Sequence, residues 1–138
     1  MILLALTFSA PALATERRAT LADLPVTDMT VVTPANYAVA SKLAERNGTP
    51  LDIVLAVVGK FEGSTQHIIQ VNEGSESPTA SRVTVLRDGL LDDSVRGDRW
   101  DITFARSANG AWTIREVKRA WRCRRGPQND RFAATPCP

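Results

Sequence analysis

Residues 99–122, RWDITFARSANGAWTIREVKRAWR, hold two alternating segments on either side of Asn109-Gly110. In the first segment Trp100, Ile102 and Phe104 fall on one face of an extended chain, since successive strand side chains point to opposite faces. An Asn-Gly pair between two such segments is the strongest short-range signal for a β-hairpin. We therefore predict an antiparallel hairpin with arms at residues 99–106 and 112–122 and a turn at residues 108–110.

The return arm of this hairpin changes its alternation partway along. Trp112 and Ile114 share one parity, whereas Val117 and Trp121 have the other. One extra residue near Arg115-Glu116 would bring all four side chains to the core face, so we predict a β-bulge there. The alternative is a plain two-residue turn, which would place Trp112 and Ile114 on the opposite face.

Upstream of the hairpin, residues 33–48 predict a helix. Thr33-Pro34 is a favourable start, with a capping hydroxyl and proline at the first helical position, and Asn47-Gly48 is a favourable stop. Between them Tyr37, Ala40, Leu43 and Ala44 fall on one face. This is the one N-terminal helix that we expect.

Residues 51–61 are rich in β-branched side chains and apolar at both parities, which favours a central strand covered on both faces. Thr49-Pro50-Leu51-Asp52 also resembles a helix N-terminus, and a helix is the alternative. Further strands are expected at residues 66–71 and 81–86. The element order predicts an α+β domain in which one helix packs on a curved antiparallel sheet of about five strands. That order resembles the cystatin-like and nuclear-transport-factor-like cones, a fold analogy.

The first fourteen residues predict a cleaved signal peptide. Ile2 to Leu13 is an apolar run that closes on Ala12-Leu13-Ala14, with small residues at the cleavage positions. No Lys or Arg precedes the run, so we expect the true start codon to lie upstream. The mature chain would begin at Thr15, with a leader at residues 15–32 and a single domain at residues 33–138. No transmembrane span is expected in it, because its longest apolar stretch, residues 53–58, is too short.

The two cysteines, Cys123 and Cys137, both lie in the last sixteen residues. We predict that they form a disulfide, which persists in the oxidising environment that export provides. A redox-active pair would more often show Cys-x-x-Cys spacing. Two cysteines and the single histidine, His67, are too few ligands for a zinc site, so no metal is expected.

The C-terminal segment is basic, because residues 115–138 carry seven Lys/Arg against two Asp/Glu, which leaves a net charge of −3 for the rest of the chain. Arginine pairs bidentately with phosphate and carboxylate, so this band is a candidate site for anionic lipid or glycan. The alternative is a solvated edge that keeps the last strand from pairing with another molecule. The candidate anion-binding residues are Arg119, Trp121, Arg122, Arg124, Arg125 and Arg131.

Catalytic residues are not apparent in this sequence. It shows no set of nucleophile, base and orienting group and no phosphate-binding loop, so neither a catalytic residue nor a cofactor is assigned. Glu116, at the predicted bulge, is the acid most worth following, because bulges re-aim side chains.

Several short motifs in the second half resemble a family of small exported bacterial proteins of unknown function. They are Asp88-Gly89, Asp92 to Gly97, Gly110-Ala111-Trp112, and Cys123-Arg124-Arg125-Gly126 followed by Cys137. The resemblance covers about residues 82–138 and implies a periplasmic or extracellular setting and a C-terminal disulfide.

We expect from these features a non-enzymatic binding or accessory module whose partner is an envelope protein or an anionic polymer, without specific nucleic-acid binding. One alternative is a cone that binds a small molecule, or acts on one, at its concave sheet face. A second alternative is attachment to anionic lipid or glycan through the basic tail.

Overall fold

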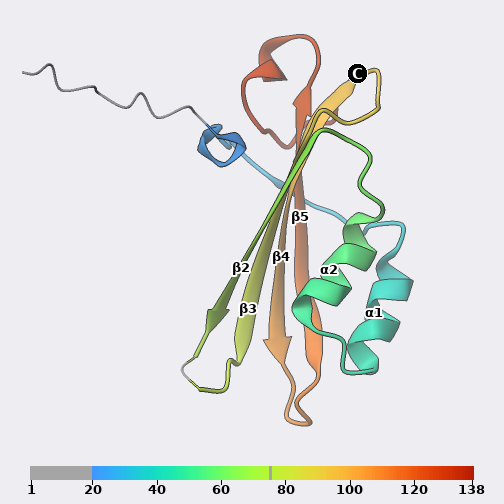
Figure 1. The fold of residues 1–138 in the computed structure, drawn as a ribbon, viewed down its shortest axis with the longest axis vertical. Helices are drawn as coiled ribbons and strands as arrows, with labels where there is room; N and C mark the ends of the chain where they lie inside the picture. Colours follow the sequence, from blue (N-terminus) through green and yellow to red (C-terminus); the bar gives the residue numbers. More distant parts are fainter. Residues whose placement is uncertain (1–19, 75) are drawn as a thin grey trace, which may run out of the picture.

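The computed structural model describes residues 20–74 and 76–138, which form a five-stranded antiparallel sheet with two helices on one face (Figure 1). This confirms the α+β class and the strand number. The strands run in the order β1-β5-β4-β3-β2. The elements are η1 (Leu21–Asp23), β1 (Thr30–Val31), α1 (Tyr37–Glu45), α2 (Pro50–Val58), β2 (Thr65–Glu73), β3 (Ala80–Asp88), β4 (Val95–Arg106), β5 (Trp112–Cys123) and η2 (Pro127–Asn129).

The predicted hairpin is formed by β4 and β5, and the predicted bulge is confirmed. Thr103 pairs with Glu116 and Phe104 with Ile114, so Arg115 is the extra residue. The bulge brings Trp112, Ile114 and Val117 to the face of the sheet that α1 and α2 cover. There they pack with the buried side chains of β4, in what we call the main core. Trp121 has the same parity but lies beyond this core, with its ring 5.0 Å from the Arg119 guanidinium.

Helix α1 ends where the sequence predicts and begins later. Asn47 has a φ of 61°, a left-handed conformation that stops the helix, and the Gly48 N–H donates to Leu43 O at 2.8 Å. At the other end, Pro34 O accepts from the Tyr37 N–H in a turn, and Asn36 is the N-cap. The start at Thr33-Pro34 was therefore placed three residues too early.

The strand predicted at residues 51–61 is wrong, because Pro50–Val58 forms helix α2. A capping box starts it: Thr49 Oγ1 accepts from the Asp52 N–H, and the Asp52 carboxylate accepts from the Thr49 N–H. The structure thus has two helices, α1 and α2, in place of the one expected. The β-branched side chains of α2, at positions 53, 54, 57 and 58, are buried against α1 and the sheet. This burial outweighs their strand propensity.

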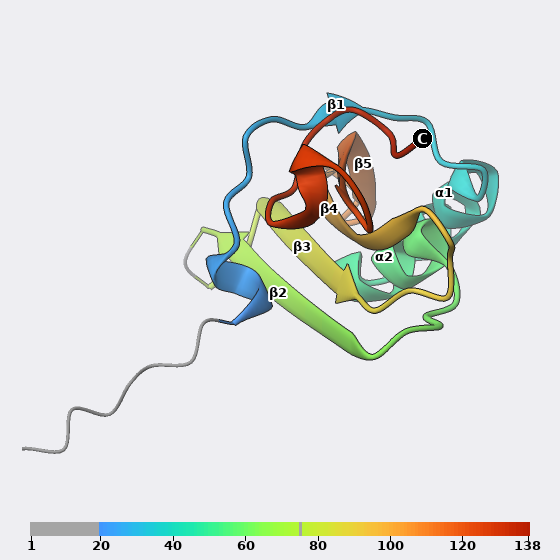
Figure 2. The ribbon, with the colours of Figure 1, turned by 90° about the horizontal axis from the view of Figure 1, so that it is seen from above.

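A second, smaller core lies on the opposite face of the sheet. Leu86, Ala120 and Phe132 are buried there, and side chains from residues 21–29 pack against them. The segment from η1 to β1 crosses this face before it reaches the helices (Figure 2). The main core under α1 and α2 and this second core together cover both faces of β3, β4 and β5.

The predicted disulfide between Cys123 and Cys137 is present and closes the tail back onto the end of β5. Gln128 Nε2 donates to the carbonyls of Trp121 and Thr135, which ties the same loop together. The predicted signal peptide, residues 1–14, lies outside the described residues, as do residues 15–19 of the leader. Within the described chain, no helix has the length and apolar character needed to cross a bilayer.

Candidate anion-binding site

A fully buried carboxylate, Asp98 on β4, is the centre of a polar cluster in the main core. Arg87 on β3 donates to it twice, from Nε to Oδ1 and from Nη2 to Oδ2, each at 2.7 Å. Trp100 Nε1 donates to Oδ2 at 2.9 Å, and Arg119 Nη2 on β5 donates to the same oxygen at 2.8 Å. Asp98 therefore binds two guanidinium groups and an indole.

Strand register brings these side chains together. Arg87 pairs with Asp98 across β3 and β4, and Trp100 pairs with Arg119 across β4 and β5. Directly opposite residues on antiparallel strands share a face, so all four point toward the helices. The backbones also approach closely beside the cluster, since a Cβ on Gly97 would lie 2.4 Å from Arg87 O. Any larger residue at position 97 would displace the strand that carries Arg87.

Helix α2 adds one more partner to the cluster. Arg87 Nη1 donates to Val58 O, at the last residue of α2, at 2.9 Å. Carbonyl groups in the last turn of a helix have no partner within the helix, and a nearby cation is favourable there. The Arg87 side chain, 7% exposed, is thus held by both a carboxylate and a helix C-terminus.

Arg119 makes fewer hydrogen bonds than Arg87 and is more exposed to solvent. Its guanidinium carbon lies 4.4 Å from the centre of the Trp100 ring and 5.0 Å from that of Trp121, distances at which cation–π attraction operates. Its Nε is buried but has no hydrogen-bond partner within the described part of the chain. The side chain as a whole is 28% exposed, so Arg119 is the arginine of the pair that solvent can reach.

A cavity of about 390 Å³ opens onto this cluster. Arg87, Trp100 and Arg119 form one side, residues 32–36 leading into α1 form another, and Val57 and Val58 of α2 close it. Two guanidinium groups and one carboxylate leave a net charge of +1. A charge removed from water is costly unless it is paired, so this cavity favours an anion.

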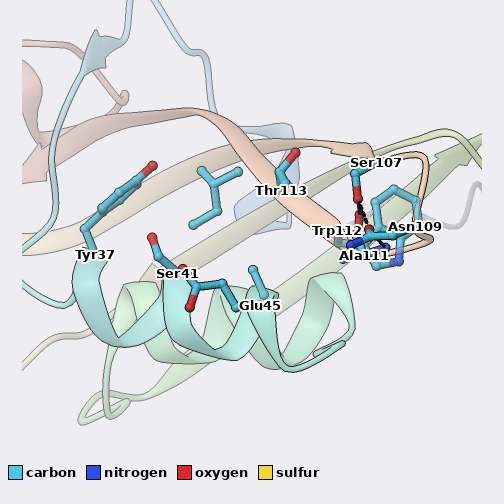
Figure 3. Close-up of a pocket in the computed structure, with 10 residues that line it drawn as sticks. Tyr37, Ser41, Glu45, Ser107, Asn109, Ala111, Trp112 and Thr113 are labelled. Atoms are coloured by element: carbon cyan, nitrogen blue, oxygen red, sulfur yellow. Dashed lines mark hydrogen bonds between the residues drawn. The ribbon is translucent and has the colours of Figure 1, made fainter.

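A second cavity, of about 400 Å³, lies between α1 and the β4–β5 hairpin (Figure 3). Tyr37, Ser41 and Glu45 line it from the helix, and Trp112 and Thr113 line it from β5. Glu45 is the single charged side chain among its lining residues. This groove therefore lacks the positive charge that the Arg87–Arg119 cavity has.

The structure separates the predicted basic band into different environments. Arg122 bonds Asp88 Oδ1 and Asn129 O, Arg124 bonds the carbonyls of Leu90 and Asp92, and Arg131 pairs with Asp130. Arg125 lines a small cavity near the disulfide with Pro138. Only Arg119 and Trp121 of the six candidates reach the cluster around Asp98. Arg122 and Arg124 instead fasten loops to the end of the sheet.

Sequence reasoning missed Arg87 and Asp98. One signal was available, since Asp98 shares the parity of Trp100, Ile102 and Phe104, which places a carboxylate on a core face. Glu116 pairs with Lys118 at 3.0 Å, and His67 lines a different cavity with Asp88 and Arg122. Among residues 20–74 and 76–138, no group of acidic, histidine or cysteine side chains could hold a metal ion.

Comparisons with family models, with curated proteins and with solved structures found no match to this chain.

Proposed function

We propose that this chain is an exported binding protein that holds a small anion, through a carboxylate or phosphate group, in the cavity beside Arg119. One observation carries the proposal: two guanidinium groups that share a single buried carboxylate line a cavity, and one of them, Arg119, has a buried Nε without a hydrogen-bond partner in the described part of the chain. Guanidinium groups pair with oxyanions through two parallel hydrogen bonds. Arg119 still has the donors for such a pair, because the hydrogen bond to Asp98 uses only Nη2.

This cavity supports the proposal better than the basic tail does. Tail attachment to an anionic polymer needs arginines that are free to bind, and Arg122, Arg124 and Arg131 bond acceptors of their own chain. Exposed basic residues also bind weakly at physiological salt, because their charges are screened. Arg119, between two indole rings at the edge of a cavity, is partly protected from that screening.

Export is the second part of the proposal. It rests on the apolar run before Ala14, on the resemblance to small exported bacterial proteins, and on the Cys123–Cys137 bond, which is stable in an oxidising compartment. The test is the intact mass of the protein recovered from the periplasm or medium of a bacterial host. A mature chain that begins at Thr15 supports export, and a chain found only in the cytosol, unprocessed and with two free thiols, contradicts it.

The binding test is calorimetric titration of the purified, disulfide-bonded protein with acetate and with inorganic phosphate, separately, at low ionic strength. NMR of the indole N–H groups gives the position, because Trp100 Nε1–H bonds Asp98 directly. We expect one of the two anions to bind at a single site and to shift the Trp100 signal. The anion that binds identifies the ligand group as carboxylate or phosphate.

Two variants with the same net charge make this test specific. Arg119→Gln removes a donor from the cavity, and Arg125→Gln removes an exposed tail cation outside it. Arg119→Gln should weaken binding at least about tenfold, equivalent to about 1.4 kcal/mol, while Arg125→Gln should leave it nearly unchanged. Equal losses in both variants would indicate general charge attraction and would overturn the proposal, as would the absence of any binding.

A further inference from the structure

Strand β2 forms one edge of the sheet, and its outer side has no partner within the described residues. Residues Thr65 to Glu73 pair with β3 in one continuous register. The opposite edge is covered over the C-terminal half of β5: β5 pairs with β1 at Lys118 and Arg119, and its Trp121 exchanges two backbone hydrogen bonds with Ala133. The chain therefore protects one edge of the sheet with its own segments and leaves β2 open.

The open edge also lacks the features that prevent strands from pairing. Residues 65–72 contain no Lys, Arg, Asp, Glu or Pro, and the β2–β3 register has no bulge. Proteins that keep an edge strand solvated use charges, proline or bulges there. Three aliphatic side chains of β2 are exposed as well: Ile68 at 37%, Ile69 at 45% and Val71 at 57%. Exposed backbone donors and acceptors next to such side chains are a template for another strand.

We propose that β2 pairs with β2 of a second copy of this chain, forming a continuous ten-stranded sheet across a two-fold axis. An isologous interface requires the same surface on both copies, and an antiparallel pair of identical strands meets this condition. In an antiparallel pair, two residues that lie opposite each other have their side chains on the same face of the sheet. The two-fold axis must therefore pass between two copies of the same residue and not between two peptide bonds. Full overlap of the nine residues puts Ile69 on that axis.

The side chains of β2 are complementary to themselves in this register. On one face Ile69 meets Ile69 of the second copy, and His67 meets Val71. On the other face Ile68 meets Gln70, and Gln66 meets Asn72, two amides that can bond each other. Glu73 lies opposite Thr65, so no like charges face one another. An aromatic side chain opposite a β-branched one, as in the His67–Val71 pairs, is favourable, whereas directly opposed like charges are not.

The test uses the purified, disulfide-bonded protein at a series of concentrations, with its mass measured by sedimentation equilibrium. We expect a monomer–dimer equilibrium. Ile69→Lys would place two ammonium groups opposite each other on the axis and should give a monomer. The control is Val39→Lys, which changes a 58% exposed valine on α1 in the same way and should stay dimeric. Circular dichroism establishes that both variants are folded.

A cysteine at the axis gives an independent readout. Opposite residues in an antiparallel pair are close enough for a disulfide, so Ile69→Cys should form a covalent dimer on mild oxidation, and Val39→Cys should not. A monomeric wild type at every concentration would overturn the proposal, and so would an Ile69→Lys variant as dimeric as wild type. A monomer in which the β2 amides that point away from β3 are protected from exchange would show that the edge is covered within one chain and would also overturn it.

Discussion

Asp98 and Arg87, on neighbouring strands, form a two-point ion pair in which both guanidinium–carboxylate hydrogen bonds measure 2.7 Å and the carboxylate has no exposed surface. The pair occupies core positions that a hydrophobic residue could fill. It orients Trp100 through the indole N–H and fixes the C-terminus of α2 through Val58 O. The stability of the main core and the geometry of the candidate anion site therefore depend on the same carboxylate.

Asp98→Ala should lower the free energy of unfolding by about 3 to 5 kcal/mol, because it leaves Arg87 buried without its counter-ion. Urea unfolding followed by circular dichroism measures this loss. The control is Glu116→Ala, whose side chain is 42% exposed and pairs with Lys118, and a cost of about 1 kcal/mol or less is expected there. Equal losses of unfolding free energy in the two variants would show that the buried Asp98 pair contributes no more to stability than an exposed pair does.

Replacing both cysteines by serine should cost about 3 kcal/mol, since the bond joins residues 14 apart in sequence and restricts the unfolded chain. The sheet should persist in this variant, because β4 and β5 pair along their length without the bond. Far-ultraviolet circular dichroism and urea unfolding with and without reductant provide the measurement. Loss of the sheet signal on reduction under native conditions would contradict this expectation.

Phe132→Ala should destabilise the protein by about 3 to 5 kcal/mol, because the ring is completely buried in the second core. The effect should be greatest in residues 20–31, because this segment packs on the ring and beside it. These residues should become accessible to protease before the main sheet unfolds. Limited proteolysis with mass identification of the first cut distinguishes this from general unfolding. A first cut within α1 or α2 would show that the two cores are not separable.

Asp92 should make the free energy of unfolding depend on pH in the acidic range. Its Oδ1 accepts from the N–H groups of Val95 and Ser94, and these bonds hold the pKa of the carboxyl below its usual value of 3.8. A lowered folded-state pKa gives stability that is complete above 3.8 and is lost as pH falls through the folded pKa. Asp92→Asn keeps an oxygen acceptor and removes the titration. The variant should show a flatter dependence of unfolding on pH below 3.8 than wild type, and identical profiles would contradict this.

The sequence was sufficient to predict the hairpin, its bulge and the disulfide, because each depends on local signals. Asn109-Gly110 indicates the turn, and the change of parity between Ile114 and Val117 places an extra residue near Arg115-Glu116, which the strand register then identifies as Arg115. Helix α2 was misassigned because its apolar residues lie on more than one face. A buried helix and a buried strand have the same hydrophobic pattern over this length, and the capping residues Thr49 and Asp52 distinguish them.

The candidate site was harder to predict, because its members come from three strands. Arg119 and Trp121 were identified as part of a basic tail, yet their neighbours in sequence, Arg122 and Arg124, point to other partners. Pairing Arg87 with Asp98 requires the register of β3 and β4, which depends on the β3–β4 loop and the close approach at Gly97. Local propensities do not contain that information.

The second core joins the two ends of the described chain. Phe132 O accepts from the Thr27 N–H at 3.0 Å, and the Phe132 N–H donates to Pro25 O at 2.9 Å, although 105 residues separate Thr27 from Phe132. A ribosome makes Thr27 long before it makes Phe132, so residues 20–31 have no docking site through most of synthesis. The segment from residue 20 to residue 31 can therefore reach its native position only after Phe132 has been made, so the second core forms late in synthesis.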